Sequence, residues 1–149
     1  MKTILSYNTI RVLAIMLFTF TTTLALCQNE YRKVKFEVSE IEPTAEGTVK
    51  IDKDKNNNYT VDLTVTGLSK PDRLTPPRTS YVVWMETAQN GTQNLGQLKS
   101  SEAALSKAMK GSLNAVTPYQ PVSFFVTAED QGNVTTPGQT VVLKTPRVQ

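Results

Sequence analysis

Apolar and polar residues alternate along several short segments of the chain. In the clearest run, one face carries Tyr59, Val61, Leu63 and Val65, and the other carries Thr60, Asp62, Thr64 and Thr66. A period of two is typical of a β-strand with one face against a core and the other in water. Runs of the same kind occur at 33–38, 48–52 and 122–129. We therefore expect strands in all four segments, and Gly67 is expected to end the strand at 59–66.

The segment 81–85 has the sequence YVVWM and is apolar at every position. A strand of this kind is expected at the centre of a sheet, buried on both faces. Asn90-Gly91 predicts a turn after it, from which residues 95–99 would return antiparallel. Other turns are expected at 52–58, a polar hairpin tip, and at 130–133, followed by a last strand at 140–145.

Residues 101–110 are ambiguous. Their alanines, Leu105 and Met109 favour a helix that Ser101 would cap, but a loop leading into a strand near 113–116 fits as well. With either reading, seven or eight short strands follow one another at regular spacing, with Pro- and Gly-rich turns. This pattern predicts an immunoglobulin-like antiparallel β-sandwich. Its expected core contains Val61, Leu63, Tyr81, Val83, Trp84, Phe124 and Val126.

The first 27 residues have the pattern of an export signal. Lys2 and Arg11 precede an apolar stretch at 12–20, and Ala25 and Cys27 have the spacing that signal peptidase requires. We expect cleavage after Cys27. Two alternatives are a lipoprotein signal, in which Cys27 is lipidated, and a retained membrane anchor, which the short apolar stretch disfavours. The remaining 28–149 are expected to form one domain that is periplasmic, attached to the cell envelope or secreted.

Composition excludes several classes of chemistry. The 149 residues include no histidine and one cysteine, which excludes Ser-His-Asp and Cys-His catalysis, His-ligated metals and an internal disulfide. The net charge of +3 falls to +1 when Lys2 and Arg11 leave with the signal, because all 13 acidic residues lie at or after Glu30. We therefore expect no nucleic-acid partner, and membrane contact only through a lipid on Cys27.

Other candidate chemistry is weak. The acids Glu40, Glu42, Glu129 and Asp130 lack a spacing that suggests a catalytic pair, and we read them as solvated turn residues. Asp52, Asp54 and Asn56 have alternating oxygens, but the glycine and glutamate of a calcium loop are missing. Met85 and Met109 alone make a poor copper site. Sequons occur at Asn58, Asn90 and Asn133. We predict no catalytic, cofactor-binding or metal-binding residue, and no cofactor.

Several short motifs together resemble a known family. They are Tyr81-Val82-Val83-Trp84, the NLGQL of 94–98, the FVTAE of 125–129, the TPGQ of 136–139 and the VVL of 141–143. This order resembles the extracytoplasmic domain of anti-sigma-K factors, over residues 47–145. The resemblance implies a small β-sandwich with a sensing role and without catalytic residues. It does not extend to sigma binding, because no sigma-binding or transmembrane segment is recognised here.

The sequence thus favours a non-enzymatic, exported interaction or sensing module whose partner is a protein or a small ligand. A carbohydrate-binding or adhesion module is one alternative, with Tyr31, Tyr59 and Tyr119 as exposed rings beside Trp84. A hydrolase of unfamiliar type, built on carboxylates, is another. The loops at the sandwich ends are the expected contact surface for a binding module.

Overall fold

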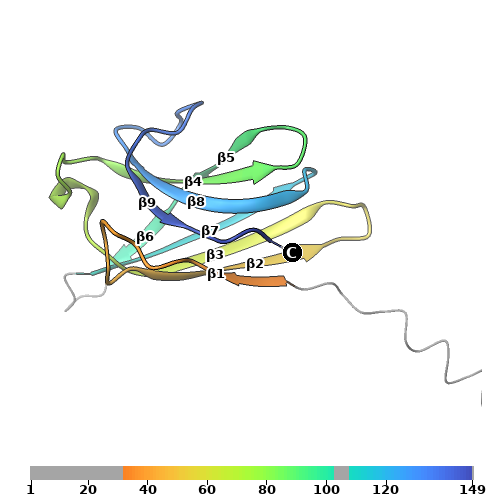
Figure 1. The fold of residues 1–149 in the computed structure, drawn as a ribbon, viewed down its shortest axis with the longest axis horizontal. Coiled ribbons are helices and arrows are strands. Elements are labelled where there is room, and N and C mark those ends of the chain that lie inside the picture. The colour runs from red at the N-terminus through yellow and green to blue at the C-terminus, as the bar shows by residue number, and fades with distance from the viewer. Residues whose placement is uncertain (1–31, 103–107, 149) are drawn as a thin grey trace, which may run out of the picture.

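The computed structural model describes residues 32–102 and 108–148. These residues form nine strands and one short 3₁₀ turn, η2 (Pro71–Arg73) (Figure 1). The strands are β1 (Arg32–Lys35), β2 (Glu46–Lys53), β3 (Tyr59–Leu68), β4 (Ser80–Thr87), β5 (Thr92–Gln97), β6 (Lys99–Glu102), β7 (Met109–Thr117), β8 (Pro121–Glu129) and β9 (Val141–Lys144).

The strands make two antiparallel sheets that pack face to face, which confirms the expected β-sandwich (Figure 1). One sheet has the order β1-β2-β3-β7-β6 and the other β5-β4-β8-β9. When the edge strand β1 is set aside, this is the immunoglobulin arrangement, with four strands in each sheet and crossovers between them. Among the described residues, no helix is long and apolar enough to cross a membrane.

Alternation places the apolar faces against each other. In β3, Val61, Leu63 and Val65 are fully buried, and Asp62 and Thr64 between them are on the exposed outer face. β2 and β7 flank β3, with Leu63 opposite Val49 on one side and Leu113 on the other. The paired residues therefore share one face, and this face forms half of the core.

The four-stranded sheet supplies the other half of the core from β4 and β8. The buried apolar side chains between the two sheets form one cluster. It contains six of the seven predicted core residues: Val61, Leu63, Tyr81, Val83, Phe124 and Val126. The seventh, Trp84, is fully buried but lies outside the cluster. Because neighbouring strand residues point to opposite faces, Trp84 and Val82 are on the outer face of this sheet.

Two sequence expectations about local structure were wrong, and the choice left open at 101–110 is decided. The described residues contain nine strands instead of seven or eight, because residues 95–99 are divided: β5 ends at Gln97, and β6 begins at Lys99 in the opposite sheet beside β7. A helix across 101–110 is excluded at both ends, since Glu102 lies in β6 and β7 begins at Met109; residues 103–107 are outside the described part. Gly67 does not end β3, which continues through an irregularity to Leu68.

Candidate functional site

Three connections meet at one end of the sandwich, which we call the loop end. They are the β2–β3 turn (54–58), the β4–β5 turn (88–91) and the β7–β8 connection (118–120), all on the right side of Figure 1. The first two turns come from different sheets, and the third crosses between the sheets. The convergence of these loops follows from the antiparallel topology.

Side chains hold the three loops in fixed shapes. In the β2–β3 turn, Asp54 Oδ1 accepts hydrogen bonds from the backbone N–H groups of Asn56 and Asn58, both at 2.8 Å. The Asn58 side chain adds a bond at 3.1 Å and is the main cause of the lowered pKa of Asp54. Asn57 can take its positive φ of 64° here, because asparagine tolerates the left-handed region.

The other two loops use threonine hydroxyls in the same way. Thr87 Oγ1 donates to the Gly91 carbonyl and accepts from the Asn90 N–H, both at 2.8 Å. Thr117 Oγ1 accepts from the Tyr119 N–H at 3.2 Å. The loop end is therefore a preformed surface rather than a set of free tips.

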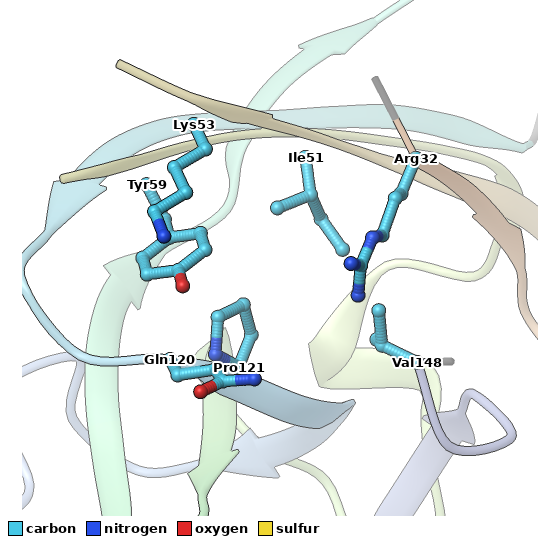
Figure 2. A pocket seen from close by; sticks show the side chains of 7 residues that line it. All are labelled: Arg32, Ile51, Lys53, Tyr59, Gln120, Pro121 and Val148. Carbon is cyan, nitrogen blue, oxygen red and sulfur yellow. The ribbon is translucent and has the colours of Figure 1, made fainter. Parts of the chain in front are cut away.

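Two adjoining hollows open at the loop end. The inner hollow has a volume of about 150 Å³ and is lined by Arg32, Ile51, Lys53, Tyr59, Gln120, Pro121 and Val148 (Figure 2). The outer hollow, of about 300 Å³, shares three of these residues, Lys53, Tyr59 and Gln120, and adds Asn57, the 87–90 segment, Pro118 and Tyr119. The inner hollow lies where the gap between the sheets reaches the surface, because its residues come from both of them.

The lining of both hollows is basic, aromatic and amide-bearing. Lys53 Nζ lies 5.5 Å from the centre of the Tyr59 ring, in the range of a cation–π contact. Arg32 pairs with Ile51 across β1 and β2, so it is on the core-facing side of the sheet, as is Lys53 two residues further along β2. Among the residues that the structure describes, neither lining includes an aspartate or a glutamate.

The structure brings together two of the four aromatic residues considered for carbohydrate binding. Tyr59 and Tyr119 both line the outer hollow, and Tyr119 is among the exposed large apolar residues. Tyr31 lies outside the described residues. Trp84 is fully buried and cannot present its ring to a ligand at the surface.

Trp84 instead anchors a buried polar network on the outer face of the four-stranded sheet. Its ring stacks on Phe125, with centroids 6.2 Å apart, and its Nε1–H donates to Thr127 Oγ1 at 2.8 Å. Thr127 in turn donates to Glu129 Oε1 at 2.5 Å, and the Gly138 N–H donates to the same oxygen at 2.7 Å. This network ties the segment 130–140 to the sheet, and sequence analysis did not predict it.

Three of the acids considered for catalysis form hydrogen bonds or ion pairs with other parts of the fold. Glu129 is buried in the network just described, whereas its neighbour Asp130 forms an exposed ion pair with Arg78 at 2.9 Å. Glu42 is also buried, and its Oε2 accepts from the Ser69 N–H at 3.2 Å and hydroxyl at 3.0 Å. The interpretation of all four acids as solvated turn residues is wrong for Glu42 and Glu129, which are internal hydrogen-bond acceptors.

Asp52 and Asp54, which were considered as calcium ligands because of their alternating oxygens, have different surroundings in the structure. Asp54 is turned into its own loop, and Asp52 alternates with Ile51 and Lys53 and so lies on the outer face. Across residues 32–102 and 108–148, no group of three or more histidine, cysteine, aspartate or glutamate side chains is placed to hold a metal ion. Cys27 lies outside the described residues.

Comparison with known proteins finds no matching family model, no matching curated protein and no matching solved structure. The class of the protein is therefore defined by its fold, a β-sandwich with an immunoglobulin strand order.

Proposed function

We propose that this protein is a non-enzymatic binding module, exported from the cytoplasm, which contacts its ligand with the loop end. The observation that carries the proposal is the convergence of three braced loops around two adjoining hollows lined by Tyr59, Lys53 and Tyr119. The pattern of an export signal in residues 1–27 supports the location. Loops held on a rigid sandwich are a common place for binding residues.

The chemistry of the lining favours binding over catalysis. Rings, amides and cations offer stacking faces, hydrogen bonds and charge, which are the means of recognising a ligand. The buried carboxylates Glu42 and Glu129 accept bonds from Ser69, Thr127 and Gly138, and these bonds hold segments of the fold together.

Two versions of the proposal differ in the ligand. The resemblance to the outer domain of anti-sigma-K factors supports a sensing role, in which the loop end contacts a partner or small ligand outside the cytoplasm. The pairing of Tyr59 and Tyr119 in the outer hollow supports a carbohydrate ligand, because sugar rings stack on exposed aromatic faces. The second version makes the sharper prediction and is the one we would test first.

The experiment is a glycan array probed with the full chain and with two variants. We expect retention of a subset of glycans by the wild type, and at least a tenfold loss for Tyr119→Ala. The matched control is Val116→Ala. Val116 lies in β7, three residues before Tyr119, and its exposed apolar side chain lines neither hollow. Equal retention of Tyr119→Ala and wild type contradicts the assignment to the loop end, and no retention by the wild type contradicts the carbohydrate version.

A further inference from the structure

We propose that Asn90 is a modification site at which the chain reacts with itself. The Gly91 backbone nitrogen attacks the Asn90 side-chain amide, and water then converts the product to an aspartate or an isoaspartate in the wall of the outer hollow. No enzyme is required. The reaction itself is independent of the proposed function, and only its effect on ligand binding rests on that function.

The reaction has two steps, in which nothing is oxidised or reduced. In the first step, the Gly91 nitrogen loses its proton and forms a bond to Asn90 Cγ, while the bond from Cγ to Nδ2 breaks and ammonia leaves. The product is a five-membered cyclic imide. In the second step, water opens the imide at one of its two carbonyl groups. Opening at Cγ gives aspartate, and opening at the main-chain carbonyl gives isoaspartate, whose backbone runs through Cβ and is one carbon longer.

The attacking nitrogen belongs to a residue that leaves it accessible. Gly91 is exposed and has a φ of 67°, and a Cβ built on it would meet no atom within 4 Å. A side chain on the residue after asparagine obstructs the approach of the nitrogen to Cγ, whereas glycine has no Cβ to do so. Asn90-Gly91 is the only Asn-Gly pair in the sequence, so the reaction is least hindered at this one place.

The amide under attack is not held by the fold. The backbone of Asn90 forms two hydrogen bonds, from its N–H to Thr87 Oγ1 at 2.8 Å and from Gln93 Nε2 to its carbonyl at 2.7 Å. Its side chain is exposed, and none of the described residues forms a hydrogen bond with its amide. By contrast, the amide of Asn58 donates to Asp54 Oδ2 at 3.1 Å. The Asn90 amide is therefore the one that is free to turn toward a neighbouring nitrogen.

Thr87 restrains the same turn and should slow the reaction. Its N–H and its Oγ1 both donate to the Gly91 carbonyl, at 3.1 and 2.8 Å, and Oγ1 also accepts from the Asn90 N–H. Ring closure requires a rotation about the Cα–C bond of Asn90 that brings the Gly91 nitrogen toward Cγ. Because this rotation separates Gly91 from Thr87, the turn must open locally before the ring can close.

The products change both the charge and the shape of the loop end. Each adds a negative charge at Asn90, which lines the outer hollow together with Tyr119. Isoaspartate also lengthens the backbone between Thr87 and Gly91, so the two hydrogen bonds to the Gly91 carbonyl cannot keep their geometry. If the proposed function holds, glycan retention by the loop end should therefore fall as Asn90 is converted.

The test is incubation of the full chain at 37 °C and pH 8.5, followed by trypsin digestion and mass spectrometry against an unincubated sample. Asn90 lies in the tryptic peptide 79–99, because Arg78 and Lys99 are consecutive cleavage sites. Each conversion adds about 1 Da to this peptide, since an NH₂ group is replaced by OH. Electron-transfer fragmentation of the peptide then distinguishes aspartate from isoaspartate.

Two other asparagines serve as controls within the same sample. Asn133 is exposed but is followed by Val134, and the amide of Asn58 is held by Asp54. We expect Asn90 to be converted at least tenfold faster than either of them. Equal rates at Asn90 and Asn133 overturn the inference.

Three variants test the roles of Gly91 and Thr87. Gly91→Ala adds one methyl group at the attacking residue and should slow the conversion of Asn90 at least tenfold. Thr87→Val keeps the shape of the side chain but removes Oγ1, and should speed the conversion at least threefold. The matched control is Thr92→Val, an exposed threonine on the other side of the same turn, which should leave the rate within about twofold of the wild type. Circular dichroism shows whether each variant is folded. An unchanged rate in Gly91→Ala overturns the proposed attack, and an unchanged rate in Thr87→Val overturns the restraint by Thr87.

The glycan array separates this reaction from the proposed function. Incubated wild type should lose retention in proportion to the converted fraction of Asn90, whereas incubated Gly91→Ala should keep its retention. Conversion of Asn90 without any loss of retention overturns the effect on binding. No retention by the unincubated chain overturns the carbohydrate version of the proposed function, and the mass measurement still decides whether Asn90 is modified.

Discussion

Thr127 is the central link of the buried network, and replacing it with valine tests the network directly. The two side chains have nearly the same shape, so Thr127→Val removes a hydroxyl without opening a cavity. The hydroxyl is fully buried, accepts from the Trp84 indole at 2.8 Å and donates to Glu129 at 2.5 Å. The substitution leaves the indole N–H without its acceptor and removes one of the two donors to Glu129 Oε1.

The expected cost can be worked out from these two bonds. A buried donor left without a partner costs about 1–3 kcal/mol, and a lost hydrogen bond to a charged acceptor costs about 1.5–3 kcal/mol. The extra buried methyl group of valine offsets about 0.8 kcal/mol. We expect a net loss of about 2–5 kcal/mol in the free energy of unfolding. For a domain of this size, this lowers Tm by roughly 6–20 °C.

The assay is urea unfolding followed by tryptophan fluorescence, with Thr64→Val as the matched control. Thr64 is on the exposed face of β3, so its substitution should change stability by less than about 0.5 kcal/mol. A double-mutant cycle adds Trp84→Phe. Because this substitution removes the only tryptophan, unfolding of the variants that carry it is monitored by circular dichroism instead of fluorescence. This substitution should cost about 1–2 kcal/mol less in the Thr127→Val background than in the wild type. A loss for Thr127→Val no greater than that for Thr64→Val would refute the reasoning.

Two further predictions concern other parts of the fold. Burial and the nearby Glu42 raise the pKa of Tyr81 well above its usual value, so the folded state keeps a proton that the unfolded state loses. The free energy of unfolding should therefore fall above about pH 10, by at most about 1.4 kcal/mol per pH unit. Urea titrations should show that Tyr81→Phe reduces this slope and that Tyr119→Phe does not. Gly67→Ala should destabilise by at least about 2 kcal/mol more than Gly91→Ala. Both glycines have positive φ, but a Cβ at Gly67 would lie 2.0 Å from the Thr44 carbonyl oxygen, whereas a Cβ at Gly91 would meet nothing within 4 Å. Equal losses of Tm in the two variants would contradict this prediction.

The strands with clear patterns could be predicted from sequence because their burial is decided locally. The alternation in 59–66 places one face in the core wherever the neighbouring strands lie. The strand β6 has no such signal. It is a short, polar edge strand, and its place beside β7 depends on pairing that the sequence does not display.

The sheet face on which Trp84 lies could not be predicted from the local pattern. Segment 81–85 is apolar on both faces, so nothing within it decides which face meets the other sheet. The missing information lies in β8, where Phe124, Val126 and Ala128 form one apolar face and Thr127 and Glu129 the other. Pairing of Trp84 with Phe125 then places the indole on the polar side. That register can be seen only in the folded chain.

The loop end was predictable in part. The turns at 52–58 and 88–91 follow from their residues, and Tyr59 and Tyr119 were singled out as exposed rings. Their meeting at one outer hollow depends on which strands are neighbours, since the two residues are 60 positions apart in the chain. The inward-facing Arg32 and Lys53 were not recognised, although a basic residue in phase with Val34 or Ile51 is a usable signal.

The most direct test of the account is an amide chemical-shift map of the full, isotope-labelled chain during titration with a glycan that the wild type retains on the array. The account predicts that the largest shifts fall in 53–59, 87–91 and 118–121, where the three loops surround the two hollows. Shifts concentrated instead in 36–45 or 130–140, away from the loop end, would contradict it.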